Sequence, residues 1–250
     1  MTAALETIGL VKKFGGITAT DNVSLAIAPG ARHALIGPNG AGKTTFVNQL
    51  TGVLAPSAGR ILLGGEDITN LRVDKRVNRG LARTFQINQL FKTMSPREAI
   101  TLALLQRSTQ AGSLWRTMPK SNEIAAAAQQ LATEFRLDDV LDETTGFLSY
   151  GKQRQLEIAL AIATQPSVLL LDEPVAGVPE AERRDLLATI AALPADITVL
   201  LIEHDMDIVF RFADRITVLV NGALFADGDP KEIAADPKVR AAYLGDDDDV

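Results

Sequence analysis

The pattern of hydrophobic and polar positions predicts two strands near the start of the chain, at residues 5–13 and 19–27. In the second stretch Val23, Leu25 and Ile27 alternate with small or polar residues, and Pro29 with Gly30 closes it in a turn. A further strand is predicted at residues 60–63, followed by a short basic helix at residues 74–79. The chain therefore begins with an antiparallel β segment.

Later apolar runs are short and continuous, which is typical of strands buried on both faces. They lie at residues 34–36, 168–171, 197–202 and 216–220, and a strand at residues 81–85 stops at Gln86. Helical patterns at residues 152–164, 180–193 and 206–212 alternate with them. Asn221 and Gly222 predict a two-residue hairpin, so residues 223–226 are expected to run antiparallel to their predecessor. The alternation predicts an α/β fold.

The middle of the chain follows a helical pattern instead. Pro96 is placed to start a helix at residues 97–106, an alanine-rich helix follows at 122–135, and residues 110–121 with Trp115 form a loop. We expect a single domain at residues 1–245, with a core at about 1–90 and 152–245 and an inserted helical subdomain at about 91–151. Residues 246–250 are expected to be a solvated acidic tail.

Composition excludes several classes of protein. The chain has 250 residues, 46% of them apolar, and no apolar run reaches the ~18–20 residues of a membrane span. No basic-then-apolar signal layout precedes the first strand, so a cytoplasmic protein is expected. The chain has no cysteine, so disulfides and thiolate catalysis are not expected, and its two histidines are too far apart in the sequence to predict a histidine metal cluster. The net charge of -6 argues against a nucleic-acid partner.

The sequence GPNGAGKTT at residues 37–45 matches the phosphate-binding loop pattern, with its fixed positions at Gly37, Gly42, Lys43 and Thr44. A predicted strand leads into it and a helix pattern at residues 44–54 leaves it. In this context backbone N–H groups and a helix N-terminus converge on an anion. Lys43 is expected to meet the β- and γ-phosphates and the Thr44 hydroxyl to hold Mg²⁺. The alternative, an ordinary glycine-rich turn, leaves the agreement of both flanks unexplained.

Polar side chains follow several of the predicted strands. Asp172 is expected to face Mg²⁺ and Glu173 to reach a water attacking the γ-phosphate, although neighbouring carboxylates at a strand end often cap the next helix. Gln86 and His204 follow strands at the same rim, where a neutral His204 would bridge the γ-phosphate and Glu173. His33, inside the strand before the loop, is predicted to be structural.

Two further positions have open alternatives. Ser149 and Gly151 in the sequence LSYGKQ either cap the helix that follows or form a second anion site at its N-terminus. Phe14, in a glycine-flanked turn, taken alone is more typical of a packing residue than of a base-stacking platform.

Together these motifs resemble the nucleotide-binding subunits of ABC transporters over nearly the whole chain, with a P-loop NTPase (RecA-like) core. The resemblance implies an ATPase using ATP and Mg²⁺, with ATP sandwiched between two subunits. Catalytic roles fall on Glu173, His204 and Gln86, and metal binding on Thr44, Gln86 and Asp172. The implied ATP-binding residues are Phe14, Gly37, Pro38, Asn39, Gly40, Ala41, Gly42, Lys43, Thr44, Thr45, Ser149 and Gly151.

Within the family, RTFQINQLFKTMSPREAI, LSYGKQRQLEIA, LLIEHDMDIV and the ending RAAYLG are most similar to ATPase subunits of branched-chain amino acid importers. Related importers of amides, urea or aromatic acids share these features. The resemblance implies two membrane permease subunits, a second ATPase subunit (the same chain or a related one), an indirect periplasmic binding protein, no nucleic acid, and a place at the cytoplasmic face of the inner membrane.

Two positions depart from the family pattern. Lys152 stands where the signature usually has glutamine, and Pro179 where the loop after the strand-end carboxylates commonly has aspartate or asparagine. Proline offers no N–H and no polar side chain, so weaker communication across the dimer is expected.

Two other classes of protein fit the sequence less well. A soluble ABC machine acting on DNA or ribosomes usually has a long coiled-coil insertion or two ATPase units, whereas this sequence has one of each motif and a modest helical insert. A small-molecule kinase with a phosphate loop would leave the sequence LSYGKQ unexplained.

Overall fold

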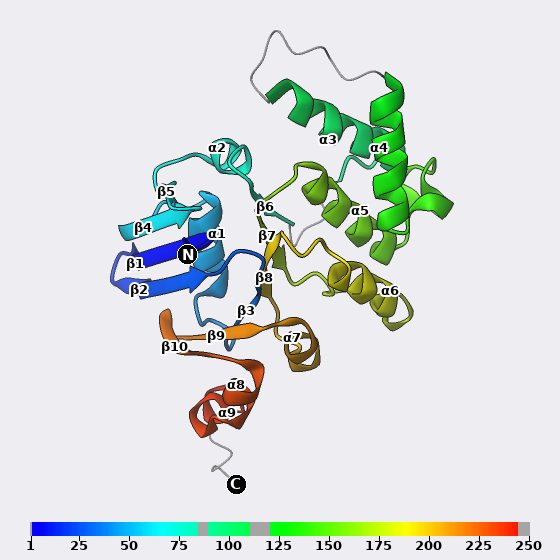
Figure 1. Cartoon of the computed structure of the whole chain (residues 1–250). Coiled ribbons are helices and arrows are strands. Elements are labelled where there is room, and N and C mark those ends of the chain that lie inside the picture. The colour runs from blue at the N-terminus through cyan, green and yellow to red at the C-terminus, as the bar shows by residue number, and fades with distance from the viewer. Residues whose placement is uncertain (1, 85–89, 111–120, 245–250) are drawn as a thin grey trace. The chain divides into compact units, whose positions relative to one another are not determined.

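The computed structural model describes residues 2–84, 90–110 and 121–244. The chain forms two compact units (Figure 1). The first unit contains Met1–Leu81, Ser167–Glu173 and Ala195–Val250, and the second contains Ala82–Pro166 and Pro174–Pro194.

An antiparallel sheet opens the first unit, in the order β2-β1-β4-β5. Its strands are β1 (Leu5–Phe14), β2 (Ile17–Ile27), β4 (Ala58–Leu63) and β5 (Glu66–Asp67). Leu5 pairs with Ile27 of β2 on one side and with Leu63 of β4 on the other. The predicted antiparallel β segment is confirmed.

The second sheet of this unit has a parallel centre. Its strands are β3 (Arg32–Ile36), β7 (Val168–Asp172), β8 (Thr198–Ile202), β9 (Arg215–Val220) and β10 (Ala223–Gly228). The short strand β6 (Leu81–Arg83) begins at Leu81, the last residue of the unit's first segment. Strand β8 pairs in parallel with β7 and with β3, and β3 pairs in parallel with β9, whereas β10 runs antiparallel to β9, with Ala223 opposite Val220. The Asn221 and Gly222 hairpin is therefore confirmed.

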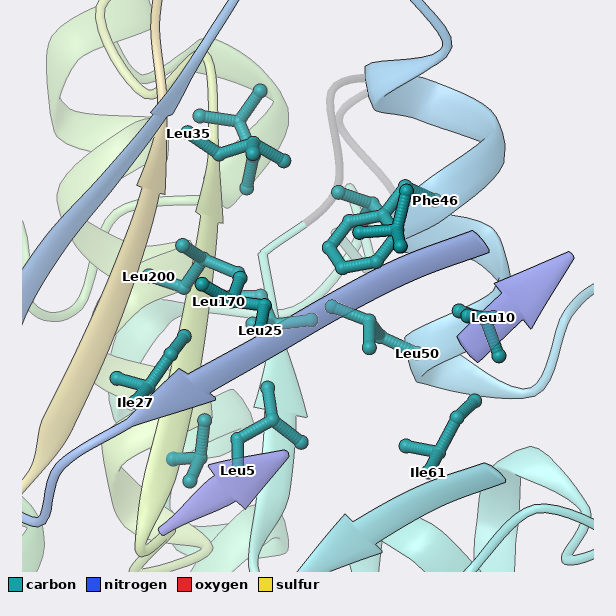
Figure 2. Packing of buried hydrophobic residues seen from close by; sticks show 14 of the residues in the cluster. Leu5, Leu10, Leu25, Ile27, Leu35, Phe46, Leu50, Ile61, Leu170 and Leu200 are labelled. Atoms are coloured by element: carbon teal, nitrogen blue, oxygen red, sulfur yellow. The ribbon is translucent and has the colours of Figure 1, made fainter. Parts of the chain in front are cut away.

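Helix α1 (Lys43–Thr51) packs among residues of both sheets. Phe46 and Leu50 lie in one buried cluster with Leu5 and Ile27 of the antiparallel sheet and Leu170 of the parallel sheet (Figure 2). The helix ends three residues before the predicted Leu54, because Gly52 adopts the left-handed conformation that terminates helices. The shared core fixes α1, and with it the loop that precedes it. The unit's remaining helices are α2 (Val73–Val77), α7 (Met206–Phe212), α8 (Pro230–Ala235) and α9 (Pro237–Leu244).

Arg76 of α2 holds the C-terminal end of α1. Its guanidinium is buried and donates to the carbonyls of Gln49 at 2.7 Å and Leu50 at 2.6 Å, and to those of Thr69 at 2.8 Å and Leu71 at 2.9 Å. The last carbonyls of a helix have no intrahelical donors and attract cations. Burial lowers the pKa of Arg76 from its usual value. The sequence predicted only a basic helix here, so this anchor was missed.

His33 is a buried structural histidine, as predicted. Its Nε2 lies 2.7 Å from Oγ1 of Thr217, whose hydroxyl donates to Asp227 at 2.9 Å. Because the threonine proton goes to the carboxylate, its oxygen accepts from His33, which fixes the neutral tautomer with Nε2–H. Burial lowers the pKa of His33 to about 4, against a smaller opposing effect of Asp227.

This histidine is expected to make stability fall in acid. The unfolded chain binds a proton at His33 near pH 6.5, whereas the folded chain does so only near pH 4. The neutral histidine therefore contributes up to about 3 kcal/mol to the free energy of unfolding. This contribution is complete above pH 6.5 and is lost as the pH falls to 4. Urea unfolding between about pH 7.5 and about pH 4.5 measures it. His33→Gln should flatten the dependence and His204→Gln should not; equal slopes in all three proteins would contradict the assignment.

The second unit is helical and contains α3 (Pro96–Gln110), α4 (Ser121–Glu134), α5 (Tyr150–Ala163) and α6 (Glu180–Ala191), with 3-10 turns Asp138–Val140 and Thr145–Phe147. Helix α3 begins at Pro96 as predicted but continues to Gln110, and α6 ends two residues before the predicted 193. The ends of the predicted loop, Gln110 and Ser121, belong to α3 and α4 instead, and residues 111–120 with Trp115 lie outside the described residues. None of the described helices is long and apolar enough to cross a membrane.

Candidate active site

The phosphate-loop residues connect β3 to α1 in the first unit. Gly42 precedes the helix with φ of 95°, and a Cβ added there would collide with the backbone oxygen of Ala19. Only glycine fits this position. Among the described residues no side chain caps α1, so the N–H groups of its first turn are left for an anion. The structure thus favours a phosphate loop over an ordinary turn.

Lys43 folds over the loop that it follows. Its Nζ donates to the carbonyl of Gly37 at 2.5 Å and to that of Pro38 at 3.1 Å. Partial burial lowers the pKa of Lys43, and the carboxylates of Glu173 and Asp172 oppose this shift. The ammonium group is therefore already held within the loop, near both strand-end carboxylates.

The back of the loop is fixed by the β9–β10 hairpin. Gly222 donates its N–H to the carbonyl of Ala41 at 2.9 Å and accepts at its own carbonyl from Asp21 of β2 at 2.8 Å. The turn at Asn221 and Gly222 thus links the loop to the antiparallel sheet. This second role of the turn was not predicted from the sequence.

The parallel register brings the strand ends to one edge of the sheet. Ile202 of β8 lies opposite Leu35 of β3 and Asp172 of β7, so the segments that follow these strands emerge together. Asp172 is buried, and the N–H of Glu173 donates to the carbonyl of Ile202 at 2.9 Å. Glu173 has φ of 45°, a left-handed conformation that is costly for a residue with a Cβ.

His204 lies beside Glu173. Its Nδ1 is 3.9 Å from Oε1 of Glu173 and 3.8 Å from Oε2 of Glu203, and its side chain is 65% exposed. Both separations are longer than a direct hydrogen bond, so the imidazole lies near the Glu173 carboxylate without a hydrogen bond to it. The Glu203 side chain is fully buried and accepts from the N–H of His204 at 3.1 Å. The sequence did not single out Glu203, although an acid directly before a strand-end histidine was a usable signal.

Phe14 ends β1 and is half exposed. The Lys12 ammonium lies 5.2 Å from the centre of its ring. Phe14 is therefore not a core residue, and its role as a base-stacking platform stays a prediction.

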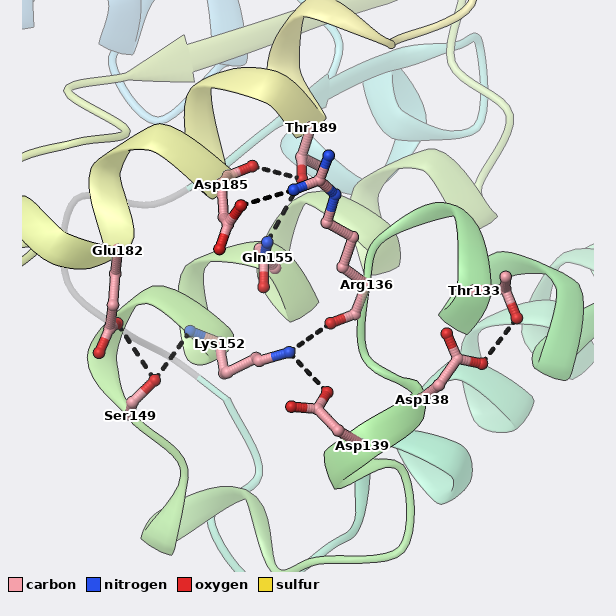
Figure 3. A network of polar contacts seen from close by, with 10 residues as sticks. All are labelled: Thr133, Arg136, Asp138, Asp139, Ser149, Lys152, Gln155, Glu182, Asp185 and Thr189. Carbon is pink, nitrogen blue, oxygen red and sulfur yellow. Dashed lines mark hydrogen bonds and ion pairs between the residues drawn. The ribbon is translucent and has the colours of Figure 1, made fainter.

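The second unit places Ser149 and Gly151 at the start of α5 (Figure 3). Ser149 is the N-cap and accepts from the N–H of Lys152 at 3.4 Å, as the capping alternative predicts, while the second anion site stays a prediction. The Lys152 ammonium donates to the Arg136 carbonyl at 2.5 Å and to Asp139 at 2.6 Å. The lysine that departs from the family pattern therefore contacts residues outside the signature.

The first unit therefore brings together Lys43, Asp172, Glu173 and His204, with Thr44 exposed directly after the lysine. Gln86 lies outside the described residues, and Ser149 and Gly151 belong to the second unit. The described residues contain no cluster of three or more His, Asp or Glu side chains that would hold a metal. The predicted oxygen ligands of Mg²⁺ remain Thr44 and Asp172, with Gln86.

Comparison with known proteins agrees with this geometry. A family model of the ABC transporter matches residues 20–176, and one of the branched-chain amino acid ATP-binding cassette transporter matches residues 223–249. The chain is similar to the high-affinity branched-chain amino acid transport ATP-binding proteins BraF of Pseudomonas aeruginosa (42% identity) and LivG of Escherichia coli (39%), over 97% of this chain and 98% of each relative.

A solved structure shares the whole fold. The ATP-binding cassette of an ABC transporter in its ADP conformation has a TM-score of 0.84 and 34% identity, covering 98% of this chain and 100% of that one. The P-loop NTPase core with an antiparallel β subdomain and a helical subdomain is thus confirmed. Matching sequence, fold and site geometry show that the chain belongs to the ABC transporter family, as an ATP-binding subunit that hydrolyses ATP.

Proposed function

We propose that this ATPase powers the uptake of branched-chain amino acids or of related small solutes such as amides, urea or aromatic acids. The similar proteins BraF and LivG are branched-chain amino acid transport ATP-binding proteins, and together with the C-terminal family match at residues 223–249 they support this substrate class. Two ATPase subunits, this chain with itself or with a related one, act on two membrane permease subunits at the cytoplasmic face of the inner membrane. A periplasmic binding protein delivers the solute.

The observation that carries the mechanism is the convergence of Lys43, Asp172, Glu173 and His204 at one edge of the parallel sheet. Lys43 exchanges the carbonyls of Gly37 and Pro38 for the β- and γ-phosphates, which offer stronger, charge-assisted bonds. The Glu173 carboxylate polarises the attacking water and accepts its proton, while His204 bridges to the γ-phosphate. Gln86 completes the catalytic set.

The remaining residues bind nucleotide and metal. Residues 37–45 surround the phosphates, Phe14 stacks on the base, and Ser149 with Gly151 contacts the nucleotide held by the partner's loop. Hydroxyl and carboxylate oxygens suit Mg²⁺, so Thr44 and Asp172 would hold it. The ion would neutralise charge on the phosphates.

Lys43→Ala is expected to weaken ATP binding about 10–100-fold, the loss of one or two charge-assisted bonds. Calorimetric titration with ATP and Mg²⁺ measures this. Lys75→Ala, which removes an exposed lysine of α2, is the matched control and should bind as wild type. Unchanged affinity in Lys43→Ala, with the fold intact by circular dichroism, would refute the phosphate role.

A surface of the second unit fits the permease partner. Phe91 is 62% exposed and Phe147 is 87% exposed. The two segments are joined by a hydrogen bond from the N–H of Gly146 to the carbonyl of Lys92, at 3.0 Å. Exposed aromatics of this kind mark protein contacts. We assign these two exposed rings to the contact with a helix of the membrane subunit.

Phe91→Lys is therefore expected to abolish assembly with the membrane subunits and to leave the ATPase rate of the isolated chain within about twofold, since the ring makes little core contact. Co-purification from membranes and ATPase assays measure the two effects. Phe225→Lys replaces an exposed phenylalanine of the first unit and should assemble normally. Loss of folding in Phe91→Lys would instead show that the ring packs in the core.

The substrate class is tested by deleting the gene in its native cells and measuring uptake of labelled leucine, acetamide, urea and benzoate. Uptake of one class should fall, and wild type but not Glu173→Gln should restore it. Normal uptake of all four, with the chain purifying with nucleic acid rather than membrane proteins, would overturn the proposal.

A further inference from the structure

A carboxylate from α6 occupies the N-terminus of α5. Oε2 of Glu182 accepts from the N–H of Gly151 at 2.7 Å. It also accepts from the Ser149 hydroxyl at 3.1 Å (Figure 3). The approach is so close that a Cβ at Gly151 would collide with this carboxylate. The two donors that the proposed function assigns to a phosphate are thus already bonded to an anion of the same chain.

Pro179 explains why Glu182 lies there. Glu182 is the third residue of α6, the position from which a glutamate normally accepts from the N–H of the N-cap residue. The N-cap is Pro179, which has no N–H. In α8 the equivalent Glu232 does make this bond, to the N–H of Asp229 at 3.1 Å. Without that local donor, Glu182 bonds to the turn before α5.

Further contacts keep the two helices in this arrangement. Asp185, one turn after Glu182, accepts from Arg136 at 2.6 Å, and Lys152 of α5 donates to the Arg136 carbonyl. Gln155 of α5 donates to Thr189 of α6 at 3.3 Å. These bonds stay in place if only the Glu182 side chain rotates away.

We propose that Glu182 blocks the signature of the separated subunit and must leave before the partner's ATP can enter. This rests on the sandwich dimer of the proposed function. The N–H of Gly151 cannot form full hydrogen bonds to the Glu182 carboxylate and to a γ-phosphate at the same time. The negative charges of these two groups also repel each other. Glu182 therefore raises the ATP concentration at which dimers form, and its release accompanies closure.

The test uses Glu173→Gln chains, which retain ATP, as the background. Adding Glu182→Gln should lower the ATP concentration for half-maximal dimerisation about tenfold, as expected for a lost charge-assisted bond. Analytical ultracentrifugation measures it. Glu180→Gln is the matched control: it removes the same charge from the same helix turn, but its side chain is 88% exposed and pairs with Arg183.

A second measurement does not need dimers. In the ATP-free monomer the Gly151 amide resonance should shift in Glu182→Gln and stay in Glu180→Gln. An unmoved Gly151 resonance, or dimers requiring equal ATP in both variants, would overturn the Glu182 proposal alone. A different outcome would refute the sandwich dimer of the proposed function. In that outcome each variant binds ATP, but none dimerises, either alone or with a second ATPase subunit.

Discussion

Glu173→Gln is expected to lower ATP turnover by about 10²–10⁴-fold while ATP binding is retained, the usual loss for a removed general base. Glu173 follows β7, its N–H is bonded to β8, and its carboxylate is partly exposed beside His204. Glutamine keeps the size of the side chain but cannot take the proton of the attacking water. ATP should then hold the dimer together.

Glu203→Gln provides the matched comparison, because both carboxylates lie within 4 Å of His204 Nδ1. The Glu203 side chain is fully buried and bonded to the backbone, so it cannot reach a water attacking the phosphate. Single-turnover hydrolysis and ATP titration of both variants separate chemistry from binding. A Glu173→Gln enzyme with near wild-type turnover, or a larger loss in Glu203→Gln, would show that the general base is assigned wrongly.

Arg76→Met is expected to lower the free energy of unfolding by about 1–3 kcal/mol, the cost of leaving buried backbone carbonyls without a hydrogen-bond donor. Its four backbone acceptors, two of them in the last turn of α1, would lose their donor. Methionine fills much of the same volume, so the loss reports hydrogen bonding more than packing.

Urea unfolding measures this effect, with the slope of the transition checked for a change in the unfolded state. Arg79→Met is the control: that guanidinium is 36% exposed and pairs with Glu66 at the surface, which predicts a loss of less than about 1 kcal/mol. Equal losses in the two variants would mean that Arg76 contributes no more than a surface ion pair.

The sequence predicted those parts of the site that depend on neighbouring residues in the chain. Lys43 comes directly after the glycines of its loop, and Glu173 comes directly after an apolar strand. In a parallel sheet the carboxyl ends of the strands meet at one edge, which places both residues there.

Two contacts were missed because the bonded residues lie far apart in the sequence. Arg76 is 26 positions from Leu50 and Glu182 is 31 positions from Gly151, and no spacing rule encodes such pairs. The end of α3 was missed for a different reason: residues 107–110 are all polar, so the apolar period that marks the helix stops before its last turn.

The left-handed conformation of Glu173 has a consequence for directed evolution. A non-glycine residue at φ of 45° costs roughly 1–2 kcal/mol, which glycine would not incur. A library of this chain sorted for heat resistance alone would therefore favour glycine or asparagine at position 173. Its most stable members would be folded and able to bind ATP, but they would lack the carboxylate that we propose as the general base. Sorting must retain transport as a criterion at every round.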